Sequence, residues 1–140
     1  MLKPKFYESE AHRISFERKV QEWHCDDDPE RYAALYILLA SPNIRDHERS
    51  VLMDKGRIIR KERSYTDNSY QDEWNEWVIL SDSDDYYQVE WITHSDSSLI
   101  RVALSVFNET NYFSAYDLRN FYSSYILEGF RLYLGNDVIL

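Results

Sequence analysis

Nine consecutive apolar residues ending at Ala40 constrain the fold of this 140-residue chain more than any other feature. Asp28 and Pro29 precede the run closely, and a Ser-Pro pair follows it directly. An aspartate before a proline is typical of a helix start, because the carboxylate caps free amides and proline suits the first helical position. A helix that is apolar on every side must be surrounded by other elements. The sequence therefore predicts a central buried helix at about 29–40.

Helical patterning recurs on both sides of this central helix. Ser9 can cap a helix that runs to about His24 and carries His12 on its apolar face, where we expect the imidazole to hydrogen-bond a neighbouring helix. Cap, break and apolar signals predict further helices at 43–53, at 97–108, as a short turn after Ser114, and as a last helix ending near Leu134 before Gly135.

The helical signal fades between Arg57 and Ile92. Three runs there are rich in β-branched and aromatic residues and alternate with polar turns, which predicts a small antiparallel sheet between about 57 and 93. The chain has no repeats and no long linker, so we expect a single domain over residues 1–140. The expected fold class is α+β and mainly α, a compact helical domain around the central helix with this small sheet.

The net charge of −9 falls entirely on the second half of the chain. Residues 1–70 carry 13 basic and 13 acidic residues, whereas residues 71–140 carry 3 and 12. Between Arg63 and Arg101 there is no Lys or Arg, although nine carboxylates lie there. Binding of nucleic-acid phosphates requires clustered Lys and Arg, so we expect no direct nucleic-acid partner.

Cys25 is the only cysteine, which excludes an intramolecular disulfide and a thiolate metal cluster and favours a reducing compartment. The N-terminus becomes charged at once, and no apolar run is long enough to span a bilayer. We therefore expect a cytoplasmic protein that does not insert into membranes. Three aspartates follow Cys25, and their negative charge weakens a thiol as a nucleophile.

Tests for catalytic and metal motifs fail. The run from Asp82 to Asp85 resembles the start of a calcium loop, but its sixth position is Tyr87 instead of Gly and its twelfth is Thr93 instead of Glu. No HExxH, HxH, nucleophile elbow or phosphate loop is present. We expect no cofactor, no metal and no assigned catalytic residue.

Aromatic residues alternate with carboxylates in the acidic segment, which we define as Tyr65 to Asp96. Aromatic anchors with a charged rim are typical of protein-binding surfaces. The same alternation arises when aromatics cover the inner face of a sheet and acids solvate its outer face, so both interpretations stay open. The predicted partner-binding residues are Trp74, Trp77, Asp82, Asp84, Asp85, Tyr86, Tyr87 and Trp91.

Several short segments of the sequence are similar to segments of a known family. They are Ala11-His12 with Phe16, residues 28–38, Arg45-Asp46-His47, residues 99–108 and residues 114–118. In this order they resemble a family of small uncharacterised proteins from Gram-positive bacteria, their phages and mobile elements. The resemblance implies a compact, mostly helical fold and an accessory setting, and it brings no activity. Residues from about Arg57 to His94 look like an expansion.

The polar residues within the resemblance form a second candidate set. They are His12, Arg31, Asp46, His47, Arg101 and Asn108. Two interpretations compete: a buried hydrogen-bond network that ties helices together, which we favour, and a small polar pocket.

The leading functional hypothesis is a non-enzymatic binding module whose acidic segment engages a basic surface of another protein. In a phage or mobile-element setting, this describes an inhibitor that presents carboxylates where phosphates would sit, or an immunity protein. The alternative is a metal-dependent hydrolase or nuclease that uses His12, His47 and Asp46.

Overall fold

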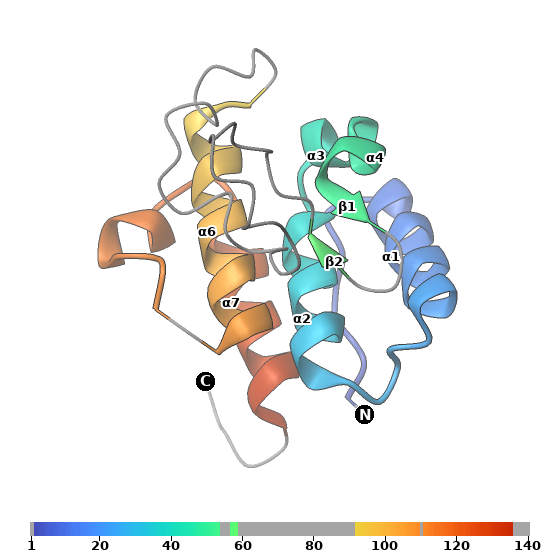
Figure 1. Cartoon of the computed structure of the whole chain (residues 1–140). Coiled ribbons are helices and arrows are strands. Elements are labelled where there is room, and N and C mark those ends of the chain that lie inside the picture. Colours follow the sequence, from blue (N-terminus) through green and yellow to red (C-terminus); the bar gives the residue numbers. More distant parts are fainter. Residues whose placement is uncertain (1, 54–56, 59–91, 110, 136–140) are drawn as a thin grey trace, which may run out of the picture.

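A computed structural model describes residues 2–53, 57–58, 92–109 and 111–135, and this part of the chain is mainly helical (Figure 1). A two-stranded antiparallel pair accompanies the helices. The helices are α1 (Glu10–Trp23), α2 (Pro29–Leu38), α3 (Pro42–Asp46), α4 (Glu48–Val51), α6 (His94–Asn108) and α7 (Ser123–Leu134), with a 3-10 turn η3 (Ala115–Leu118). The strands are β1 (Leu52–Met53) and β2 (Arg57–Ile58). The expected mainly helical architecture is confirmed for these residues.

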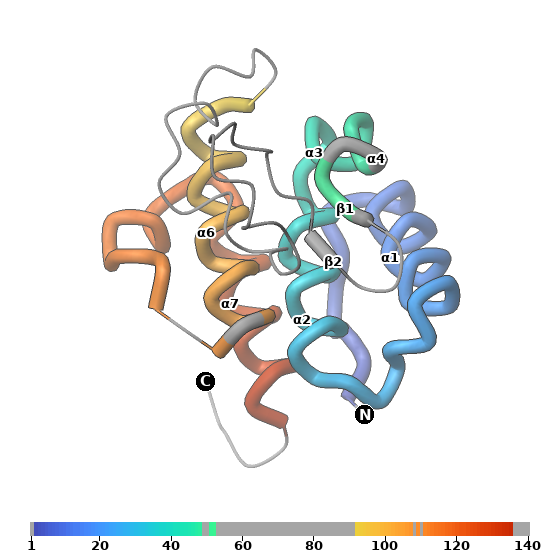
Figure 2. Tube along the Cα trace, in the orientation of Figure 1, coloured from blue at the N-terminus to red at the C-terminus, as the bar shows by residue number. Residues whose placement is uncertain are grey.

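The predicted central helix is the centre of the core. Helix α2 lies between α1 on one side and α6 and α7 on the other (Figure 2), and it contacts all three. Its residues from Tyr32 to Leu38 are all buried. Its N-cap is Asp28, whose carboxylate accepts a hydrogen bond from the Arg31 amide at 3.2 Å. The helix ends at Leu38, earlier than the sequence predicted, because the Ala40 and Ser41 amides bond three residues back instead of four and Pro42 opens α3.

Helix α7 reaches α2 through a glycine. A Cβ built on Gly129 would lie 2.5 Å from Cδ1 of Ile37 and still nearer to its Cγ1. The Ile37 side chain is fully buried, so it has little room to move away. The absence of a side chain at Gly129 therefore sets how closely these two helices pack.

Gly129→Ala is expected to lower the free energy of unfolding by about 1–2 kcal/mol, because overpacking at so close an approach costs roughly 2–3 kcal/mol and the gain in helix propensity offsets about 1. Chemical denaturation measures the change. Ser124→Ala, at an exposed position of α7, is the control and should be neutral or slightly stabilising. A Gly129→Ala variant as stable as the wild type would contradict this account of the packing.

The predicted helix at 43–53 is wrong in part. Helix α3 ends at Asp46, α4 begins after His47, and Leu52 already has the extended angles φ −109° and ψ 133°. Leu52 pairs with Ile58 and Met53 pairs with Arg57. Backbone pairing with β2 thus overrides the local helical preference of residues 52–53. Arg57 and Ile58 are extended, but they pair with residues 52–53, which the predicted sheet does not include. Residues 59–91 of the expected sheet lie outside the described residues, so that sheet stays a prediction.

Helix α6 begins at His94, three residues before the predicted start. Thr93 and Asp96 form a capping box: the Asp96 amide donates to Thr93 Oγ1 at 3.1 Å, and the Thr93 amide donates to Asp96 Oδ2 at 3.1 Å. The buried Asp96 carboxylate also accepts from Ser41 Oγ at 2.6 Å and from Asn43 Nδ2 at 2.9 Å. These bonds fix the start of α6 against the start of α3.

Candidate functional site

The eight predicted partner-binding residues, from Trp74 to Trp91, lie outside the described residues. Only the C-terminal end of the acidic segment is described. Asp96 is 1% exposed and holds α3 against α6, so its carboxylate does not belong to a partner-binding surface. The described helices therefore show how the acidic segment is anchored at its C-terminal end.

His12 belongs to the core. Its Nδ1 accepts a hydrogen bond from the Glu8 amide at 2.9 Å, and its Nε2 donates to the Tyr36 carbonyl at 2.9 Å. An amide can only donate and a carbonyl can only accept, so the ring is the neutral Nε2–H tautomer. Burial lowers the pKa of His12 from 6.5 to about 4. Both ring nitrogens are thus occupied, which leaves no lone pair for a metal.

The other members of this polar set lie at separate places. Arg31 pairs with Asp28 at 3.0 Å in the first turn of α2 and stacks over the Phe107 ring. Asp46 is exposed at the end of α3, and His47 bonds the Asn43 carbonyl through Nδ1 at 2.9 Å. Arg101, on α6, pairs with the Asp117 carboxylate at 2.7 Å. The side chain of Asn108 lies outside the part of the chain that the structure describes. No cluster of three His, Cys, Asp or Glu side chains suited to a metal occurs among the described residues.

A buried carboxylate that the sequence did not single out orders the turn before α7. Asp117 accepts hydrogen bonds from Ser98 Oγ at 2.9 Å, from Arg101 Nη2 at 2.7 Å and from the Ser114 amide at 3.0 Å. Burial alone would raise the pKa of Asp117, but these bonds outweigh it and lower the pKa. The Ser-x-x-Asp spacing of a capping box is the sequence signal that could have identified it.

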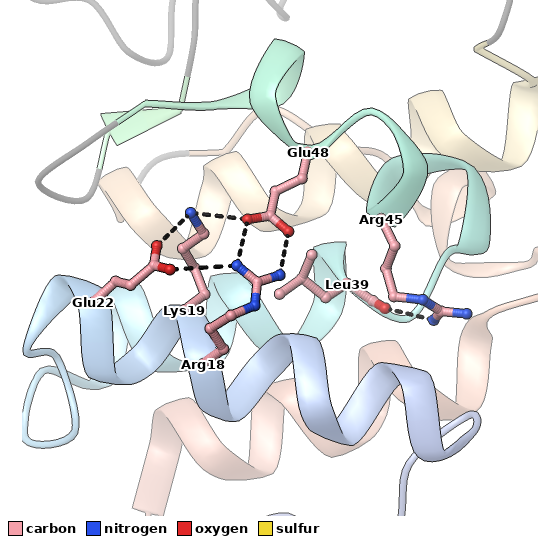
Figure 3. Close-up of polar contacts among 6 residues, drawn as sticks. All are labelled: Arg18, Lys19, Glu22, Leu39, Arg45 and Glu48. Carbon is pink, nitrogen blue, oxygen red and sulfur yellow. Dashed lines mark hydrogen bonds and ion pairs between the residues drawn. The ribbon is translucent and has the colours of Figure 1, made fainter.

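Helix α1 is joined to α4 by four charged side chains, which we call the α1–α4 ion-pair network (Figure 3). Arg18 and Lys19 each contact Glu48 at 2.9 Å, and both also pair with Glu22. Burial would raise the pKa of Glu48, but its bonds to Arg18 and Lys19 lower it. The network holds α4, and with it the entry into β1, against the helical body.

Arg45 closes the end of α2. Its Nη1 donates to the Leu39 carbonyl at 2.9 Å (Figure 3) and pairs with Glu8 at 3.0 Å. The guanidinium therefore satisfies a carbonyl beyond the end of the helix and also ties α3 to the segment before α1.

Cys25 is 1% exposed in the connection between α1 and α2. Burial, followed by the charge of Asp28, raises the pKa of its thiol to about 12. The group stays a thiol at neutral pH, so it is no nucleophile in the folded protein.

A groove of about 640 Å³ lies between the segment before α1, helix α1 and the α1–α2 connection. Tyr7, Phe16 and Tyr32 provide aromatic walls, and Glu17 and Asp26 are exposed at its rim. The sequence analysis did not single out these residues as a set, because they are spread over the first 32 positions and have no motif spacing.

Comparison with known proteins adds no relative: no protein-family model, curated protein or solved structure matches the chain. Among the helices that the structure describes, none combines the length and apolar character required to cross a membrane.

Proposed function

We propose that the protein is a binding module whose acidic segment engages a basic surface of another protein. The observation that carries the proposal is the distribution of charge. The described residues hold 12 basic and 14 acidic residues, whereas the remaining residues hold 4 and 11. Seven of the nine excess negative charges thus belong to residues outside the described part of the chain, and such a concentration would steer a basic partner during association.

Anchoring at both ends supports this role. Pairing of β1 with β2 and the α1–α4 ion-pair network hold the chain up to Ile58, and the Thr93–Asp96 capping box holds it again after Ile92. Asp96 accepts hydrogen bonds from Ser41 and Asn43, so the capping box lies against the start of α3. Helix α3 comes directly before α4 and β1 in the chain, so both anchors are close to the same part of the fold. The helical body therefore holds the described residues on both sides of this segment close to α3 and α4.

The ionisable groups of the helical body also favour binding over catalysis. His12 has both nitrogens engaged in the core, Cys25 stays protonated, and Asp117 is held by Arg101. A general acid or base must reach a substrate and exchange protons near the working pH. His12 and Asp117 have structural partners instead, and the buried Cys25 thiol is uncharged at neutral pH.

In its sharpest form, the proposal describes an inhibitor or immunity protein of a phage or mobile element. Carboxylates spaced along the acidic segment would occupy a surface that otherwise binds phosphates. Aromatic residues such as Trp77 and Trp91 would then supply the buried anchors of the interface.

The test is affinity capture from the organism that encodes the protein, followed by reconstitution with the purified partner. We expect a basic partner, an affinity that falls as salt concentration rises, and loss of roughly tenfold or more in affinity when Asp82, Asp84 and Asp85 are changed to Asn. The control changes three exposed carboxylates of the helical body, with Glu10→Gln, Asp46→Asn and Glu109→Gln, and has the same net charge. Equal loss in both variants, or in neither, would overturn the assignment to the acidic segment.

A further inference from the structure

The segment before α1 is held to the helical body by side chains alone. We call residues 3–8 the strap. Its backbone groups bond side chains of three helices at distances of 2.6 to 2.9 Å, and these partners are His12, Tyr36, Glu128 and Arg131. No hydrogen bond joins the strap to another backbone group within the described part of the chain. Each attachment is a single side-chain bond, so the strap can separate at a lower cost than a helix can.

His12 attaches the strap to α1. Its Nδ1 accepts a hydrogen bond from the Glu8 amide, and its Nε2 donates to the Tyr36 carbonyl, both at 2.9 Å. The charged and titratable groups that face its ring are Tyr7 and Glu8 of the strap, Tyr36 of α2, Arg45 of α3 and Tyr125 of α7. The Glu8 carboxylate already pairs with Arg45 at 3.0 Å, and these two charges act on the imidazole in opposite directions.

A second proton on His12 is incompatible with the attached strap. Nδ1 would become a donor, and it would face the Glu8 amide, which is also a donor. The Nε2–H bond to the Tyr36 carbonyl survives, because this nitrogen carries its proton in both forms. The conflict therefore falls on the strap and leaves the contact between α1 and α2 in place.

We propose that the strap is a proton-sensitive latch: uptake of a proton by His12 releases residues 3–8 while the helices stay packed. Release uncovers the rings that Phe6 and Tyr7 contact, which are those of Phe16, Tyr36 and Tyr125. The latch consists of described residues of the helical body and does not rest on the proposed function of the acidic segment.

The pH window follows from the two states of His12. With the strap attached, burial lowers the pKa of His12 from 6.5 to about 4, whereas in the released state Nδ1 faces water and the pKa returns toward 6.5. The released state therefore binds more protons between these values. Its population relative to the attached state rises as the pH falls, by up to about tenfold per pH unit and roughly 300-fold across the window.

A second strap partner titrates at lower pH. Burial would raise the pKa of Glu128, but its bonds to Arg131 and to the Lys5 amide lower it. Release breaks the bond to Lys5, so protonation of Glu128 also favours the released state. The effect of Glu128 therefore lies below the window of His12 and is distinguished from it by pH.

The test is native-state hydrogen exchange of the whole protein from pH 6.5 to pH 4, corrected for the intrinsic dependence of exchange on pH. We expect the Lys5 and Glu8 amides to lose protection together, by up to roughly 300-fold. The buried amides of residues 35–38 in α2 exchange only through larger openings, so they should stay at least about tenfold better protected at each pH. Equal protection of the strap and of α2, or a loss at Glu8 without one at Lys5, would overturn the proposal.

Two variants separate the proton from the attachment. His12→Gln does not titrate, so protection of the Lys5 amide should no longer change with pH in this window. Tyr36→Phe removes the bond to the Phe6 carbonyl and keeps His12, so it should raise strap opening by roughly fivefold at every pH, the usual effect of one hydrogen bond, with an unchanged slope. The wild-type slope in His12→Gln, or its loss in Tyr36→Phe, would show that His12 does not control the strap.

Discussion

Replacing Asp117 by alanine is expected to lower the free energy of unfolding by about 3 kcal/mol or more, the usual cost of breaking a buried ion pair. The side chain is 5% exposed, and Arg101, which it contacts at 2.7 Å, is 17% exposed. Alanine removes the acceptor for Ser98 and for the Ser114 amide together with the carboxylate that balances the guanidinium. The loss is a large part of the 5–15 kcal/mol that stabilises a typical domain, on the order of a third of it.

Urea denaturation of two further variants separates charge from shape. Asp117→Asn keeps the size of the side chain and part of its hydrogen bonding, so it should cost less than alanine does. Asp27→Ala, at an exposed position, should stay within about 0.5 kcal/mol of the wild type. A loss below about 1 kcal/mol for Asp117→Ala would show that this carboxylate does not order the turn.

Acidification from pH 6.5 to pH 4 is expected to remove about 3 kcal/mol of stability through His12 alone. In the unfolded chain this imidazole takes up a proton near pH 6.5, whereas in the folded protein burial lowers its pKa to about 4. The unfolded state therefore binds more protons between these values. The contribution is fully present above pH 6.5 and is lost as the pH falls toward 4.

His12→Gln is the matched variant, since the Gln amide can also accept one hydrogen bond and donate another but does not titrate. We expect it to be less stable than the wild type at pH 7 and to lack most of the dependence on pH between 6.5 and 4. Urea denaturation at several pH values measures both effects. If the slope in this window is the same in the variant, other groups cause it and the neutral His12 is not its origin.

The helices could be predicted where their signals are local. Ser9 and Asp28 cap α1 and α2 as the sequence indicated, because each cap needs only an amide three residues further on. The strand at Leu52 could not be predicted, since it depends on pairing with Ile58. Thr93 and Asp96 have the same kind of local signal, because each bonds the amide of the other three residues away, yet the predicted helix begins only at residue 97.

The site was harder to predict than the fold. His12 hydrogen-bonds α2, as its position on the apolar face of α1 indicated, but the polar residues grouped with it have separate partners. The groove has no linear signature, because folding of the segment before α1 brings Tyr7 to Tyr32. Sequence spacing reveals groups that share one element. It does not reveal groups that come together only when separate elements pack.

The rate at which the Cys25 thiol is modified reports how often the α1–α2 connection opens in the folded protein. A thiol that is 1% exposed and protonated cannot react with a disulfide reagent until the α1–α2 connection opens. The modification rate under native conditions then equals the open fraction multiplied by the rate for a free thiol, which yields the free energy of that opening.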